Sequence, residues 1–111
     1  GVDFLDREIL KGSLEIILLS LLKNKDMYGY EISKEIKNIT ENVLILGEGT
    51  LYPALKRLKE KNLIQDYFIE TNSSKKKRKY YKITEAGLIE LNLKLKDFYL
   101  ISNLIENIKE E

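Results

Sequence analysis

The chain has 111 residues, a length that suits one small domain. It contains no cysteine and no histidine, which excludes disulfides and thiolate chemistry and removes the commonest metal ligand and general base. Lysine and arginine (19) almost balance aspartate and glutamate (18), for a net charge of +1, so a basic surface requires an uneven distribution of charge along the chain.

The composition argues against an enzyme and against a membrane protein. Without histidine or cysteine, catalysis would depend on perturbed carboxylates or lysines, and no acidic pair lies in an apolar pattern that would perturb one. No uninterrupted apolar run reaches the length of a membrane span, and there is no signal-peptide pattern. We therefore expect a soluble, cytoplasmic protein without a cofactor or metal.

The first part of the chain predicts two helices. A helix from Asp3 to about Lys23 is apolar nearly all round in its second half, so it must be covered on two sides, by its own domain and by a partner chain. Asp26 is expected to cap a second helix from about Met27 to Ile39. Its inward face would carry Tyr28, Ile32, Ile36 and Ile39. Residues 42–46 are apolar and suit a short buried strand or an extended link.

The segment GEGTLYPALKRL, residues 47–58, predicts a turn that runs into a short helix around which the rest of the chain is organised. By helical spacing, the buried face would consist of Leu51, Leu55 and Leu58, and the outward face of Pro53, Lys56 and Arg57. Glycines let another surface approach closely, and the N–H groups of a helix N-terminus suit a phosphate. Taken alone, however, Gly-x-Gly is more typical of a simple turn.

The ends of this helix are predicted from its capping residues. Thr50 as the N-cap would leave Pro53 in the first turn, where the missing N–H is tolerated, whereas Gly47 as the N-cap would place Pro53 deeper in the helix. We prefer Thr50. Asn62 tolerates the left-handed conformation that ends many helices, and Leu63 begins a new element.

Two strands, residues 63–70 and 80–83, flank a polar segment and predict a hairpin with a basic tip. The purely basic stretch comprises Lys75, Lys76, Lys77, Arg78, Lys79 and Lys82. Such a run is as often a solvated loop as a binding surface. The order helix, helix, short strand, helix and hairpin is typical of a winged helix-turn-helix, which inserts one helix into the major groove of DNA.

The last helix is predicted to begin at Thr84 and Glu85 and to end near Ile108. Its near-heptad apolar stripe consists of Leu88, Leu91, Leu95, Phe98 and Ile105. A helix of this length, roughly 35 Å at about 1.5 Å per residue, would project beyond the domain. The stripe could belong to the core of the monomer, but the excess apolar surface of both terminal helices favours a two-fold dimer.

Three segments resemble the PadR family of winged-helix transcriptional regulators. GTLYPALKRL at residues 49–58 resembles the recognition helix of that family, YGYEI at 28–32 its second-helix motif, and RKYYKIT at 78–84 its second wing strand and the entry to its last helix. The three occur in the right order and cover most of the chain. The resemblance implies a dimeric regulator of the compact subgroup, which has a single C-terminal dimerisation helix.

We therefore predict a mainly α fold with a small β-hairpin wing, in which a winged helix-turn-helix at residues 1–83 and a dimerisation helix at 84–111 form one compact unit. The predicted function is sequence-specific binding of double-stranded DNA by a dimeric repressor. The predicted DNA contacts are Gly49, Thr50, Tyr52, Lys56, Arg57, Lys75, Lys76, Lys77 and Arg78, and the predicted dimer contacts are Leu91, Leu95, Phe98 and Ile105. The alternative is a winged-helix adapter that binds an acidic protein partner through the same surface.

The resemblance also implies an effector site. Some compact PadR-like regulators hold flat hydrophobic compounds between aromatic side chains of the dimer interface, with residues of the first helix lining the site. The corresponding residues here are Glu15, Leu19 and Phe98, and the Glu15 carboxylate would favour a planar cationic ligand. Tyr99 points about 100° away from Phe98. The simpler interpretation, which we prefer, is that Phe98 only packs in the dimer core.

Overall fold

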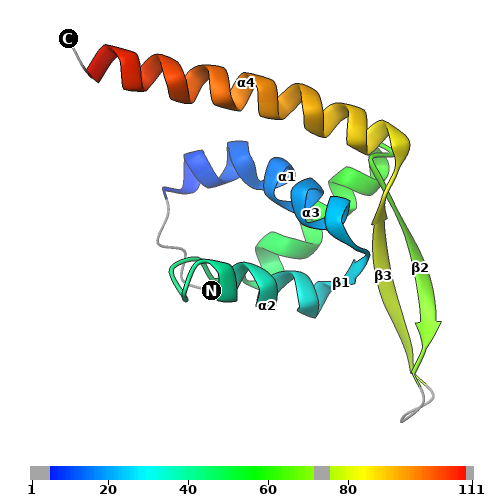
Figure 1. Ribbon diagram of the computed structural model, residues 1–111. Coiled ribbons are helices and arrows are strands. Elements are labelled where there is room, and N and C mark those ends of the chain that lie inside the picture. The colour runs from blue at the N-terminus through cyan, green and yellow to red at the C-terminus, as the bar shows by residue number, and fades with distance from the viewer. Residues whose placement is uncertain (1–5, 72–75, 110–111) are drawn as a thin grey trace.

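The computed structural model describes residues 6–71 and 76–109 (Figure 1). In chain order its elements are α1 (Arg7–Asn24), β1 (Met27–Tyr28), α2 (Gly29–Ile39), α3 (Glu48–Glu60), β2 (Ile64–Glu70), β3 (Lys77–Ile83) and α4 (Glu85–Lys109). The predicted class, mainly α-helical with a small hairpin, is confirmed. Among these helices, none is both long and apolar enough to cross a membrane.

Three antiparallel strands form one small sheet in the order β1-β3-β2. β2 and β3 are paired along their whole length, and Figure 1 shows this hairpin extending away from the helices. β1 adds Met27 and Tyr28 at the root of the hairpin. The hairpin is predicted correctly from the sequence, but its second strand begins at Lys77 rather than Tyr80, because the ladder continues as far as the Glu70–Lys77 pair.

Of the two alternatives for residues 42–46, the link is correct, because the sheet consists of β1, β3 and β2. Asn42 has a φ of 69° in the turn after α2, and Leu44 and Leu46 of the link are buried. The third strand is β1, whose residues are predicted to open the second helix. Pairing with β3 satisfies backbone groups of Met27 and Tyr28, and α2 therefore begins only at Gly29.

The start of α2 also has a different cap. Asp26 does not cap it, because the Asp26 carboxylate accepts a hydrogen bond of 2.6 Å from the phenol of Tyr67. Tyr28 is the N-cap residue, and its backbone N–H donates to the Glu31 carboxylate at 3.3 Å. At the other end, Ile39 is 65% exposed and does not join the inward face, since α2 ends there.

The first helix begins later than the sequence predicts. Its start is Arg7 rather than Asp3, which lies outside the described residues. Asp6 is the N-cap, because its carboxylate accepts hydrogen bonds from the backbone N–H groups of Glu8 (2.9 Å) and Ile9 (3.2 Å).

The apolar second half of α1 is covered on two sides within its own chain. Figure 1 shows α1 between α4 on one side and the α2–α3 pair on the other. The fully buried side chains of the core are Leu18, Leu19, Leu22, Ile32, Leu51, Leu55, Leu58, Ile64 and Leu91. The side of α1 that is predicted to be covered by a partner chain is thus covered by α4 instead.

The N-cap of the organising helix α3 is Gly47, so the preference for Thr50 as its N-cap is wrong and the alternative is correct. With Gly47 as the cap, Leu46 and Leu51 take the two positions, before the cap and at the end of the first turn, that pack together in a hydrophobic staple. Both are buried, at 5% and 1% exposed. Pro53 consequently lies inside the helix, where it removes one backbone hydrogen bond.

The end of α3 is as predicted. Asn62 has a φ of 61° and its N–H bonds to the carbonyl of Lys59 at 2.9 Å, while the N–H of Leu63 reaches back to the carbonyl of Leu58 at 3.0 Å. This is the Schellman arrangement, completed by burial of both Leu58 and Leu63. It fixes the direction in which the chain leaves α3 for the hairpin.

The last helix packs on the domain through its first part only. Thr84 caps it, because its hydroxyl accepts the N–H of Gly87 at 3.0 Å. Leu91 is completely buried and Leu95 is partly buried, whereas the side chains from Lys96 to Ile108 are exposed. The molecule is accordingly elongated, with extents of 61 × 31 × 20 Å.

Candidate nucleic-acid interface

One face of α3 is exposed to solvent. By helical geometry, Gly49, Pro53 and Lys56 lie near its centre, with Tyr52 on one flank and Arg57 on the other, and all five are exposed. Of the residues of α3 predicted to contact DNA, only Thr50 is half-buried. An added Cβ on Gly49 would meet no atom within 4 Å, so its lack of a side chain leaves open space on this face.

Gly29 leaves room for the Tyr52 side chain. A Cβ on Gly29, the first residue of α2, would collide with the Tyr52 hydroxyl and would come within 2.7 Å of the ring carbon that carries it. Tyr52 can therefore lie over the start of α2 only because residue 29 has no side chain. Together with Arg78 and Lys79 of β3, these two residues line a recess of about 310 Å³ that joins α3 to the wing.

The wing, which we define as the β2–β3 hairpin, exposes a row of cations. Lys76, Lys77 and Arg78 are all exposed, and Lys75 lies outside the described residues. The Arg78 guanidinium lies 4.1 Å from the centroid of the Tyr28 ring. Stacking over an aromatic face restrains a guanidinium without neutralising it, so Arg78 is both oriented and available to an anion.

Other lysines near the wing are paired with an acid. The Asp66 carboxylate lies 2.9 Å from the Lys59 ammonium and 3.8 Å from that of Lys79. The hydrogen bond from Lys59 lowers the pKa of Asp66 below its ordinary value. Asp66 therefore offsets part of the positive charge of Lys59 and Lys79. We expect these two lysines to attract an anion less strongly than Lys76, Lys77 and Arg78 do.

A row of four tyrosines runs across the root of the wing. The ring centroids are 5.8 Å apart for Tyr67 and Tyr80, 5.4 Å for Tyr80 and Tyr28, and 6.3 Å for Tyr28 and Tyr30. Tyr67 also donates its phenol to Asp26, which raises the pKa of Tyr67 to about 12. The row packs β2, β3 and β1 against the start of α2 and so fixes the wing relative to α3. Sequence reasoning did not identify it, since the pairs depend on strand register.

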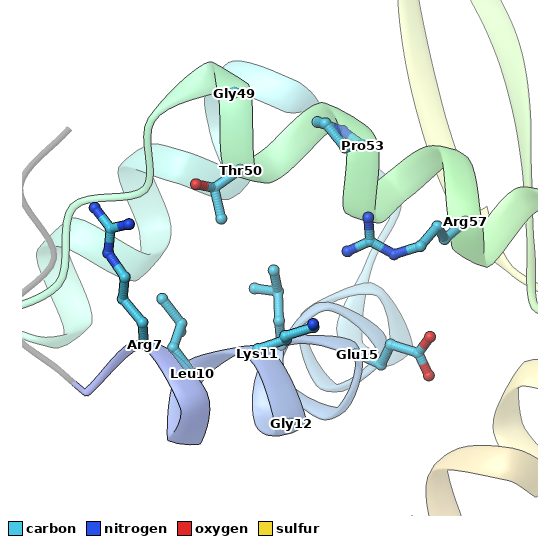
Figure 2. Close-up of a pocket in the computed structure, with 10 residues that line it drawn as sticks. Arg7, Leu10, Lys11, Gly12, Glu15, Gly49, Thr50, Pro53 and Arg57 are labelled. Atoms are coloured by element: carbon cyan, nitrogen blue, oxygen red, sulfur yellow. The ribbon is translucent and has the colours of Figure 1, made fainter.

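A cleft of about 750 Å³ lies between the first half of α1 and α3 (Figure 2). Its charged lining consists of Arg7, Lys11, Glu15 and Arg57. Figure 2 shows Arg7 and Arg57 at two ends of the space with Lys11 between them, while the Glu15 carboxylate points away from it. That carboxylate lies 2.6 Å from the Lys61 ammonium and 3.7 Å from that of Lys94.

Within one chain, the predicted effector residues do not meet in a pocket. Leu19 is completely buried in the core, Glu15 is paired with the two lysines, and Phe98 is exposed on α4. Phe98 is in edge contact with Tyr99, with ring centroids 5.8 Å apart. Leu19 therefore has no surface to offer a ligand, and the Glu15 charge is already compensated.

The predicted dimer residues divide into two groups. Leu91 is 0% exposed within its own chain and has no surface left for a partner to cover, so its assignment to a dimer interface is withdrawn. Leu95 is partly buried, and Phe98 and Ile105 are 46% and 54% exposed. Around them, α4 also exposes Leu93, Leu100, Ile101, Leu104 and Ile108.

A family model described as the transcriptional regulator PadR-like family matches residues 18–93. An uncharacterized protein of Lysinibacillus sphaericus is 40% identical over 103 residues, which cover 93% of this chain and 94% of that protein. The transcriptional regulator YqjI of Escherichia coli is 38% identical over 53 residues, which are 48% of this chain and only 26% of that protein.

Solved structures of transcriptional regulators superpose on this chain. A transcriptional regulator from Clostridium thermocellum superposes with a TM-score of 0.83 at 36% identity, over 90% of this chain and 96% of that one. A PadR family regulator from Clostridium difficile superposes with a TM-score of 0.75 at 38% identity, over 86% of this chain and 97% of that one. A PadR-like regulator from Bacillus cereus superposes with a TM-score of 0.80 at 31% identity, over 94% of this chain and 98% of that one.

Proposed function

Because the chain belongs to the PadR-like family of transcriptional regulators, which are not enzymes, we propose that it is a dimeric repressor that binds specific sequences of double-stranded DNA. The observation that carries this proposal is the continuity of α3 with the wing. The exposed Tyr52 of α3 and the oriented Arg78 of β3 line one recess. A single DNA duplex can therefore contact α3 and the wing at the same time.

In this proposal, α3 lies in the major groove. Gly49 gives close access to the groove, and Tyr52, Lys56 and Arg57 reach base edges or nearby phosphates. Arg57 has five N–H donors in a planar fork and is our candidate for the bidentate contact with guanine. The wing supplies phosphate contacts through Lys76, Lys77 and Arg78, and Lys75 remains a predicted contact.

Dimerisation through residues 84–111 is supported by the unburied apolar surface of α4. Phe98 and Ile105 belong to an apolar row that extends beyond the domain, and leaving such a row in water is unfavourable at about 25 cal/mol per Å².

Release of DNA by a planar hydrophobic or cationic effector is a further part of the proposal, and Phe98 is the residue that supports it. In a two-fold dimer two Phe98 rings could face each other, each beside its Tyr99, and hold a flat compound. Calorimetric titration with a planar cationic dye tests this. Binding that disappears in Phe98→Ala, with the dimer intact, supports an effector site, and no binding by the wild type leaves only dimer packing.

The proposed function is tested by selecting fragments of genomic DNA on the purified protein. A repressor dimer should enrich fragments that share an inverted repeat, with half-sites about one helical turn or a multiple of it apart. Its affinity should fall steeply with salt. A protein adapter that uses this surface for an acidic partner would enrich no common sequence, and this result would overturn the proposal.

A further inference from the structure

Three cations line the α1–α3 cleft, Arg7, Lys11 and Arg57. Among the described residues, no carboxylate forms an ion pair with Arg7, Lys11 or Arg57. The one acid of the lining, Glu15, is paired with two lysines. The lining of the cleft therefore has a net positive charge that no ion pair among the described residues offsets.

Arg7 and Lys11 are four residues apart on α1, so they are neighbours on one helix face. Two like charges at this spacing repel each other and destabilise the helix. Both side chains line the cleft rather than extend away from it. An anion in the cleft would convert this repulsion into two favourable contacts.

The cleft lies on one flank of α3 and the wing lies on the other. Thr50 and Arg57 face the cleft, whereas Tyr52 borders the recess shared with the wing. A helix that occupies the major groove, about 12 Å wide, has a phosphate backbone on each side. The wing cations would contact one of these backbones, and the other would pass along the cleft.

Resting on the proposed function, we propose that Arg7 and Lys11 bind a phosphate of the DNA backbone on the side of α3 opposite the wing. The DNA interface then includes α1 as well as α3 and the wing. These contacts read no bases, so they strengthen binding to every sequence and clamp α3 in the groove from both sides.

The test measures the binding of a labelled random-sequence duplex to the full chain over a range of salt concentrations. Arg7→Gln with Lys11→Gln should reduce the slope of log affinity against log salt by about 0.9, the value for one phosphate contact. Lys96→Gln is the control, since Lys96 is also exposed but lies in α4, on the opposite side of α1 from α3. It should leave the slope unchanged.

A wild-type slope retained by the double variant overturns the proposal. Thermal unfolding distinguishes a site for a free anion from a site for a DNA phosphate. The melting temperature is compared in inorganic pyrophosphate and in sodium chloride of equal ionic strength. If pyrophosphate raises the melting temperature of the wild type but not of the double variant, and the salt slope is unchanged, the cleft is a small-anion site and our assignment to DNA is wrong. If the wild type itself binds DNA without salt dependence, the proposed function fails first.

Discussion

The phenol of Tyr67 donates a hydrogen bond of 2.6 Å to the carboxylate of Asp26, 41 residues earlier in the chain. This bond ties the middle of β2 to the connection between α1 and β1. Because Tyr67 also stacks on Tyr80, it restrains both strands of the wing. The direction of the wing relative to α3 is therefore set by tertiary contacts as well as by the loop between them.

The Tyr67–Asp26 bond should make stability depend on alkaline pH. The bond to the carboxylate, with some burial, raises the pKa of Tyr67 from 10.0 to about 12. A pKa higher in the folded state means that the contribution is complete below about pH 10 and is lost as the pH rises toward about 12. Urea unfolding should show the stability advantage of the wild type over Tyr67→Phe shrinking in that interval. A difference that stays constant with pH would contradict this role.

Substitution of two glycines by alanine should affect different properties, stability for Gly87 and DNA binding for Gly29. Gly87→Ala would push a Cβ against the backbone carbonyl of Leu63 and within 2.7 Å of Ile83, so we expect a loss of about 1–3 kcal/mol in the free energy of unfolding. Gly29→Ala meets only the end of the Tyr52 side chain, which can move.

We therefore expect Gly29→Ala to change stability little but to weaken DNA binding, because Tyr52 leaves its place. Urea unfolding and DNA titration of both variants check this pair. Equal losses of stability in the two proteins would show that Tyr52 is not free to move.

The dimer proposal is tested by two residues of α4 that differ in burial. Ile105→Glu removes exposed apolar surface from a proposed interface and would bury an unpaired charge there, so light scattering at micromolar concentration should show a monomer with normal stability. Leu91→Ala should instead lower the free energy of unfolding by about 2–5 kcal/mol, because Leu91 is buried in its own chain. A wild-type protein that is monomeric at this concentration would refute the dimer.

The wing lysines should contribute affinity without specificity. Replacing Lys76 and Lys77 by Gln should reduce the log–log salt slope by up to about 1.8, while the ranking of DNA sequences stays the same. The Lys96→Gln control should match the wild type. An unchanged slope in the double variant would mean that the exposed lysines of the hairpin are only solvated.

Local signals were enough to predict most of the fold. The spacing of Leu51, Leu55 and Leu58 gave the buried face of α3, and Asn62 gave its end. Long-range contacts decided the elements that were predicted wrongly. β1 forms because β3 pairs with it across the sheet, and Leu91 is buried because α4 folds back on α1, which periodicity cannot distinguish from a dimer stripe.

The exposed positions of the candidate interface also follow from local signals in the sequence. Helical spacing indicated the outward positions of Lys56 and Arg57, and the basic run indicated the wing. The support for these side chains was not predictable, because the stacking of Arg78 on Tyr28 and the fit of Tyr52 over Gly29 depend on register and on the crossing of α2 and α3.

The most direct test of the account is the base preference of Arg57→Ala, measured by selection from a random DNA library beside the wild type. If the exposed face of α3 reads DNA, the variant should remain folded and lose discrimination at one position of each half-site, at a cost of about 1–3 kcal/mol. An intact variant with the affinity and base preference of the wild type would contradict the account.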